Sequence, residues 1–447
     1  MRLTCIYPCF VLLAASAIFS FRAEAQLTFS GNIRPAVTET PDASSGLSAV
    51  YVLERTDGVT ASYAASSSSN SVRWFKFSAL GGGYAEEVAS TRDGNVSSIR
   101  LTSEDLGYIV EEGSARKCYW VTNYANHVCE LRYLSIAPEQ DCMSASLLFS
   151  GNADRITYYT INGVARTLSR GLTLEYTTLV YNAERNAYLQ TVETRELEYA
   201  SGEVHAPAPL CQTDFLLTGD RFQMAWGGGR TIGTPTFEPR AVEAVTSATQ
   251  TSRTVDNEQK NSDGGTTGAL GGSAPVEIKF EAVVTDAAIY QEWQFATDPQ
   301  FDLIDMRVNS TESTRVFNEY GTVYARFVAG DASGLCDWTS ETYTISIGES
   351  KLECPNAFSP GASEGSNDEW KVSYKSIISF DCHIFNRWGI EVAHLTDPSQ
   401  GWDGRHNGKL VKSGVFYYVI QAEGADGKQY KLSGDINVIH ANYNKGY

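Results

Sequence analysis

The sequence predicts an all-β protein made of tandem β-sandwich domains, and three observations carry this prediction. Apolar residues show almost no helical periodicity. Short runs rich in Val, Ile, Thr, Tyr and Phe recur between clusters of Gly, Asn, Asp and Ser. Asn-Gly and Asp-Gly pairs, which favour hairpin turns, stand between these runs. At about 100 to 150 residues per domain, a chain of 447 residues holds three or four domains after a leader.

Residues 1–25 have the pattern of a secretory signal peptide. Arg2 precedes an apolar run over residues 6–21, and Ala23-Glu24-Ala25 is a small-x-small cleavage pattern. We therefore expect cleavage near Ala25. No other apolar stretch approaches the roughly 18 to 20 residues of a membrane helix, so we expect no transmembrane segment in the mature chain.

The formal net charge of −18 argues against nucleic acid as a partner. Phosphate binding needs a basic stripe, and an excess of acids repels it. The charge fits a protein that stays soluble at a negatively charged cell surface.

The first two predicted domains cover residues 26–134 and 135–245. Trp74 stands where a sandwich keeps its core tryptophan, and Asp105-Leu106-Gly107-Tyr108 resembles the tyrosine corner of immunoglobulin-like domains. In the second domain we expect a hairpin around Asn162-Gly163, and Leu217-Thr218-Gly219-Asp220 is interpreted as a turn between two strands.

Residues 246–273 are polar and rich in Gly and Ser, which predicts a flexible linker because such a segment cannot bury enough apolar surface to fold. The next unit, 274–347, resembles PKD and fibronectin-like surface modules. Its matching residues are an inner tryptophan followed by an F-x-x-x-G-x-x-Y turn, namely Trp293, Phe317, Gly321 and Tyr324.

The last unit, 352–442, alternates strands with tight turns. Asp403-Gly404, Asn407-Gly408 and Asp426-Gly427 offer the positive φ values that close hairpins. Trp388 and Trp402 are interpreted as large core or edge-packing residues of a small domain.

The motifs PNAFSP, ND, IFNRWG, GWDG, NGK and SGVFYYVI follow one another in this unit. In this order they closely resemble the gliding motility-associated C-terminal domain, the type B sorting domain of the type IX secretion system. The resemblance implies passage through an outer-membrane translocon and association with a PorP/SprF-like outer-membrane protein. It places the mature protein at the cell surface or outside the cell, associated with the outer membrane.

The resemblance also implies a set of sorting and partner-recognition residues. Arg387 is the strongest of them, because a guanidinium offers a fork of donors that specifies a partner. The full set is Pro355, Asn356, Phe358, Asn367, Asp368, Asn386, Arg387, Trp388, Gly389, Trp402, Asp403, Gly404 and Gly414. Most of the Gly, Trp and Phe positions have turn formation or packing as the alternative role.

Seven of the nine cysteines remain after removal of Cys5 and Cys9, and the odd number leaves at least one free thiol. Cys118 and Cys129 lie symmetrically about a turn and are a candidate hairpin disulfide, with two buried free thiols as the alternative. Cys142 and Cys211 could tie together the ends of the second domain.

No metal or cofactor is predicted. There is no Cys/His cluster with zinc spacing, and the six histidines are scattered along the chain. The sorting family commonly has an acid-rich FSPNGDGxND loop, whereas FSPGASEGSND offers Glu364 and Asp368 as its carboxylates, which are few for calcium.

No catalytic residue is predicted either. Gly361-Ala362-Ser363-Glu364-Gly365 formally matches the G-x-S-x-G elbow, but that elbow needs a strand turning into a helix, and no helical pattern follows here. The leading hypothesis is a non-enzymatic, multi-domain surface or secreted protein, or an accessory part of the secretion machinery itself. The alternative is a secreted glycan-binding protein or hydrolase with its site in residues 27–245.

Overall fold

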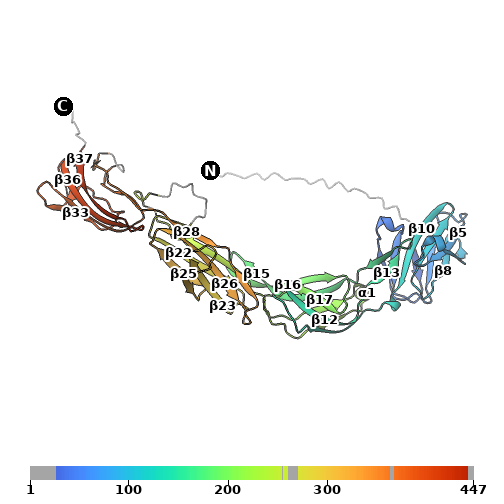
Figure 1. Cartoon of the computed structure of the whole chain (residues 1–447). Coiled ribbons are helices and arrows are strands. Elements are labelled where there is room, and N and C mark those ends of the chain that lie inside the picture. The colour runs from blue at the N-terminus through green and yellow to red at the C-terminus, as the bar shows by residue number, and fades with distance from the viewer. Residues whose placement is uncertain (1–26, 254, 260–269, 363–366, 441–447) are drawn as a thin grey trace, which may run out of the picture.

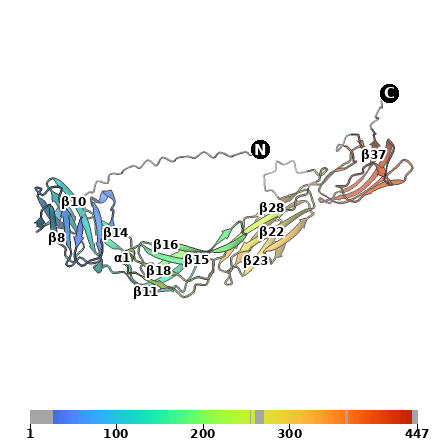
Figure 2. The ribbon, with the colours of Figure 1, turned by 180° about the vertical axis from the view of Figure 1, so that it is seen from behind.

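The structure is a computed structural model that describes residues 27–253, 255–259, 270–362 and 367–440. Figure 1 shows an elongated row of β-rich domains that follow one another in chain order, and Figure 2 shows the same row from behind. The described residues contain one α-helix, α1 (Arg221–Ala225). The predicted all-β class is confirmed.

The first domain is a sandwich of two sheets around Trp74, which is fully buried and donates from Nε1 to Ser97 Oγ over 3.0 Å. Tyr108 is buried, and its hydroxyl is hydrogen-bonded to Thr102, as a tyrosine corner requires. The first sheet has the order β1 (Thr28–Ser30), β4 (Thr60–Ala64), β8 (Val96–Arg100) and β7 (Thr91–Asp93). The second has the order β2 (Val37–Glu39), β3 (Ala49–Leu53), β10 (Ala115–Asn123), β9 (Leu106–Glu112), β5 (Val72–Phe77) and β6 (Glu86–Val88).

The second domain also has two main sheets and begins before residue 135. The first sheet has the order β11 (Glu130–Ile136), β12 (Ser144–Asn152) and β17 (Glu203–Pro207). The second has the order β16 (Ala187–Leu197), β15 (Leu172–Asn182), β18 (Leu216–Gly219) and β19 (Arg230–Gly233). The expected turn at Leu217–Asp220 is wrong: Leu217 to Gly219 continue β18, and the Asp220 side chain caps α1 by accepting from Gln223 N.

The hairpin around Asn162-Gly163 is confirmed, and it joins the first two domains. Its strands are β13 (Ile156–Tyr159) and β14 (Ala165–Leu168). Ile161 donates from its backbone to Ser45 O and accepts from Gly82 N, so the turn is bonded to the first domain. Both domains contribute to one apolar core, which includes Trp120 of the first and Phe222 of the second.

A buried ion pair strengthens this first junction. Arg170 Nη1 lies 2.9 Å from Asp220 Oδ2, and both side chains are shielded from solvent. The Tyr124 hydroxyl, from the first domain, lies 3.0 Å from each Asp220 oxygen. Because this carboxylate is held by a cation, a hydroxyl and a helix N-terminus, the first two domains are fixed to each other.

The third domain starts earlier than expected, because part of the predicted linker is folded. Its first sheet has the order β20 (Ala244–Gln250), β22 (Val276–Val284) and β25 (Glu312–Phe317). Its second has the order β21 (Leu270–Gly272), β28 (Tyr343–Ile347), β26 (Gly321–Gly330), β23 (Tyr290–Ala296) and β24 (Met306–Val308), with β27 (Asp337–Thr339) on β26. Polar residues 246–250 form a strand because β22 supplies a full ladder of backbone partners. Residues 260–269 lie outside the described residues.

The second and third domains are joined covalently. A disulfide links Cys142 to Cys336, with Cα atoms 5.4 Å apart. Beside it, Arg240 Nε lies 3.3 Å from Asp331 Oδ2, and Ser333 donates to the same carboxylate. These hydrogen bonds hold the pKa of Asp331 well below its usual value.

The fourth domain contains a sheet in the order β30 (Ala357–Phe358), β37 (Gln429–Val438), β36 (Gly414–Gly424), β32 (Ile377–Phe385) and β33 (Glu391–Leu395). Two small pairs complete it, β29 (Lys351–Glu353) with β31 (Ser373–Lys375), and β34 (Arg405–His406) with β35 (Lys409–Leu410). Hydrogen bonds connect it to the third domain: Tyr320 N donates to Ala425 O over 3.0 Å, and Ser376 N to Ser273 Oγ over 2.8 Å. Asn257, from the predicted linker, donates to Val372 O.

Candidate functional site

The strand directions of the fourth domain bring the candidate recognition residues to one end of its sheet. β32 ends there at Phe385, opposite Tyr417 near the start of β36. Gly414 pairs with Val438 at the end of β37, and Phe358 of β30 pairs with Val438 from the other side. The opposite end holds the Ala425 turn that contacts the third domain. We call the first of these the distal end.

The turn after β32 presents Arg387 and Trp388 to solvent. The Asn386 side chain accepts from Trp388 N and Ile390 N over 2.9 and 3.1 Å, and Gly389 supplies the positive φ of 78° that closes the turn. The Arg387 guanidinium lies 4.2 Å from the centre of the Trp388 ring. Asn386 and Gly389 thus shape the turn, while the arginine and the tryptophan form its exposed face.

The predicted packing role of Trp388 is wrong, because 70% of this residue is exposed. The turn directs its side chain away from the core of the domain. The exposed apolar residues of the fourth domain also include Ile390 in the same turn and Val415 and Tyr417 in the first half of β36. Together with Arg387 and Trp388 they define the distal surface. A solvent-exposed group of this kind is typical of a docking surface.

Three of the predicted recognition residues are buried and act in packing. Trp402 contacts Phe358 and Phe416 at ring-centre distances of 5.4 and 5.1 Å and donates from Nε1 to Arg405 O. Its predicted packing role is confirmed. Gly404 has a φ of 73° and lies against Pro360 and Phe358, so a side chain there would be both strained and crowded.

The other candidates lie on the loops of the same end, except Gly414, which begins β36. Pro355, Asn356, Asn367, Asp403 and Gly414 are exposed, and Asp368 is half-buried and accepts from Gly361 N over 2.9 Å. Asn356 O accepts both backbone and side-chain hydrogen bonds from Asn437. Ser363, Glu364 and Gly365 of the G-x-S-x-G match lie outside the described residues.

The candidate Cys142–Cys211 pair is wrong, and for Cys118 and Cys129 the alternative of two buried free thiols holds. Cys142 bonds to Cys336 of the third domain rather than to Cys211. Cys118 and Cys129 are free because the chain between them does not form a hairpin: β10 leads into a short 3-10 helix (Tyr124–Asn126) and then into β11 of the next domain. Burial raises the pKa of the Cys129 thiol to about 11, so it is not a thiolate at neutral pH.

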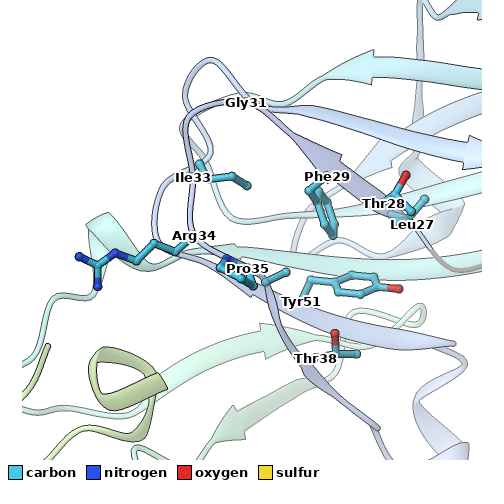
Figure 3. Close-up of a pocket in the computed structure, with 10 residues that line it drawn as sticks. Leu27, Thr28, Phe29, Gly31, Ile33, Arg34, Pro35, Thr38 and Tyr51 are labelled. Atoms are coloured by element: carbon cyan, nitrogen blue, oxygen red, sulfur yellow. The ribbon is translucent and has the colours of Figure 1, made fainter. Parts of the chain in front are cut away.

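Two hollows lie in the first two domains. One, of about 420 Å³, lies beside β1 and β3, where the rings of Phe29 and Tyr51 meet at 5.0 Å while Arg34 points away (Figure 3). A second, of about 800 Å³, lies at the first junction near Cys129, Gln223 and Trp226. The second hollow is also lined by Glu54 and Glu130, which are ion-paired with Arg34 and Arg132, and no histidine is among the residues that line either hollow.

Two of the histidines that are scattered along the sequence lie together in the structure. His383 and His394 stack with ring centres 4.2 Å apart, and Asp381 lies beside them. The sequence pattern that could have indicated this cluster is the pair Asp381 and His383. They are two residues apart on one strand, so their side chains lie on the same face. The position of His394 beside them depends on the register between the two strands, which the sequence does not reveal.

Comparison with protein families assigns two parts of the chain. The fold is that of a multi-domain protein whose β-domains follow one another along the chain. Residues 352–438 match the CHU_C Type IX secretion signal domain, and residues 135–234 match a Fibronectin type III domain. The chain therefore carries a type IX secretion signal and is a secreted or surface multi-domain protein. The fibronectin match lies on the second domain, whereas the sequence resemblance pointed to 274–347.

Among solved structures, the chain is similar to a tetra-tandem repeat from the extending region of a large adhesion protein. The two share 11% sequence identity, the match covers 87% of this chain and 98% of that chain, and the TM-score is 0.20. The FN1–FN3 domains of chicken CNTN1 show 12% identity, 70% and 99% coverage and a TM-score of 0.24. These scores are too low to support a functional argument. A search of curated proteins gave no match. Within the described residues, no helix has the length and apolar character to cross a membrane.

Proposed function

We propose that the fourth domain is a sorting and attachment signal read through its distal surface, and that the three domains before it carry a contact surface away from the outer membrane. One observation carries the proposal. The residues implied in recognition come from five separate stretches between 355 and 414, and the strand directions gather them at the end of the domain that faces away from the third domain.

The chemistry of the distal surface suits a protein partner. Arg387 offers a planar fork of donors, and among the described residues it has no ion-pair partner of its own. Trp388 adds a large apolar ring, and Trp and Arg are the residues that most often dominate binding energy in protein interfaces. We propose the type IX translocon and a PorP/SprF-like outer-membrane protein as the successive partners, and outer-membrane association as the resulting location.

We further propose that the protein is not an enzyme. Support comes from the lack of a histidine among the residues that line these two hollows, from the ion pairs that engage Glu54 and Glu130 in the second hollow, and from the high pKa of the Cys129 thiol. The proposed role is either display of a binding surface or service as an accessory part of the secretion machinery. Co-purification from intact outer membranes distinguishes the two, because an accessory protein should return with translocon components rather than with an external ligand.

The test of the sorting role is a deletion paired with a graft. Removal of residues 352–447 should leave the first three domains folded but retained in the periplasm. The graft should contain residues 242–447, because the fourth domain is hydrogen-bonded to Asn257 and Ser273 of the preceding segment. Fused to a passenger with a signal peptide, it should carry that passenger to the surface. Accessibility to external protease is the readout, and normal surface delivery of the truncated chain would refute the proposal.

A further inference from the structure

A side-chain cluster on the solvent-facing side of β32 and β33 offers ligands to a metal ion. Asp381 and His383 are two residues apart on β32 and therefore share a face. His394 of β33 is the direct cross-strand partner of His383. The inner face of β32 consists instead of Phe380, Cys382 and Ile384, which are buried in the core.

We propose that Asp381, His383 and His394 bind a divalent transition metal ion of the Zn²⁺ class. One ligand atom from each residue lies within 4.8 Å of the others. His394 Nε2 is 2.6 Å from Asp381 Oδ1, and His383 Nε2 is 3.3 Å from Asp381 Oδ2. Tetrahedral ligands about 2.0 to 2.1 Å from zinc stand about 3.3 Å apart, so binding requires only small side-chain rotations.

A fourth residue orients the site. Glu391 Oε2 lies 2.9 Å from His383 Nδ1. A carboxylate that accepts the Nδ1 proton of an imidazole fixes the tautomer whose Nε2 lone pair is available to a metal. Glu391 reaches this place because the pairing of β32 with β33 shifts register between Ile384 and Phe385, so that Phe385 stands opposite Glu391. The arrangement of carboxylate, histidine and open ligand atom is thus preformed on the sheet.

The donor set decides the class of ion. Two imidazoles and one carboxylate suit Zn²⁺, Ni²⁺ or Cu²⁺, whereas Mg²⁺ and Ca²⁺ prefer oxygen ligands throughout. The side chains of Asp381, His383 and His394 are 50%, 34% and 43% exposed, so an ion can enter from solvent and keep a position open for water or for a ligand from another molecule. Binding would also tie together the two strands that flank the Arg387 turn.

The test is calorimetric titration of the metal-free mature chain, residues 26–447, with Zn²⁺. The wild-type chain should bind one Zn²⁺ ion saturably at the site formed by Asp381, His383 and His394. When Co²⁺ replaces Zn²⁺, the bound cobalt should show the visible absorption of an ion with nitrogen ligands. His383→Gln and His394→Gln should abolish this binding. Glu391→Gln should weaken it by about tenfold, as expected for the loss of an orienting carboxylate.

His205→Gln is the matched control, because His205 is an exposed histidine of the second domain. Its binding should equal that of the wild-type chain. The proposal is overturned if the wild-type chain shows no saturable binding, if both histidine variants bind normally, or if equimolar Mg²⁺ displaces Zn²⁺. Hydrogen exchange of the fourth domain should be the same in the variants as in the wild-type chain when both are metal-free. This result would show that the variants lose metal binding because they lack a ligand and not because they are unfolded. Export measurements are separate, since the site lies outside the distal surface.

Discussion

Two tryptophans of the fourth domain should respond in opposite ways to truncation. Trp402 is 3% exposed, and burying a tryptophan removes about 150 to 250 Å² from water, worth about 4 to 6 kcal/mol at about 25 cal/mol per Å². Measured Trp→Ala losses in cores are about 3 to 5 kcal/mol, so Trp402→Ala should unfold or loosen the domain. Trp388→Ala should change stability by less than about 0.5 kcal/mol, because its ring is mostly in solvent.

Hydrogen exchange read from peptides of residues 352–438, together with surface protease accessibility in cells, separates folding from recognition. Trp402→Ala should lose exchange protection and surface delivery together. Arg387→Ala and Trp388→Ala should keep full protection and yet lose delivery. Arg132→Ala, an exposed arginine of the second domain, is the control and should change neither. Normal delivery of both Arg387→Ala and Trp388→Ala would refute the role of the distal surface.

Three further predictions concern the domains before the sorting signal. Peptide mapping without reduction should recover Cys142 linked to Cys336, and a Cys142–Cys211 peptide would contradict the structure. Asp220→Ala should destabilise the first two domains by about 3 to 5 kcal/mol in chemical denaturation, because it leaves a buried guanidinium unpaired, and a loss under about 1 kcal/mol would refute the proposed junction. Hydrogen bonds led by that from Ser66 lower the pKa of Glu112 from 4.5 to about 2. Its contribution to stability is therefore present above pH 4.5 and lost as pH falls towards 2, and Glu112→Gln should remove this part of the pH dependence in thermal melts.

Local chemistry explains what the sequence could predict. The Asn162-Gly163 hairpin and the core positions of Trp74 and Trp402 were predicted correctly, because turn chemistry and large apolar rings act within a few residues of their place in the chain. The gathering of recognition residues at the distal end could be inferred only from family resemblance, since it depends on the order of strands in the sheet.

Two of the failures depend on partners far away in the sequence, and two depend on local turn and register geometry that residue type does not reveal. Residues 246–250 look like linker by composition, but β22 supplies their hydrogen bonds. Cys142 finds a partner 194 residues away, in another domain. His394 meets His383 through a register that includes a bulge. Trp388 has the size of a core residue, but the turn built by Asn386 points it outward.

The bond between Cys142 and Cys336 changes how the chain would carry tension. A pull applied to the first domain against an anchored fourth domain would pass along the backbone to residue 142, cross the sulfur bridge, and continue from residue 336. The stretch between them, residues 143–335, forms a closed side loop that includes most of the second and third domains. Drag from flow or from a bound particle would therefore load the first and fourth domains together with β11, β27 and β28, which lie outside the loop, whereas the strands between residues 142 and 336 stay out of the force path, so the covalent clamp sets a limit on how far the molecule can be drawn out.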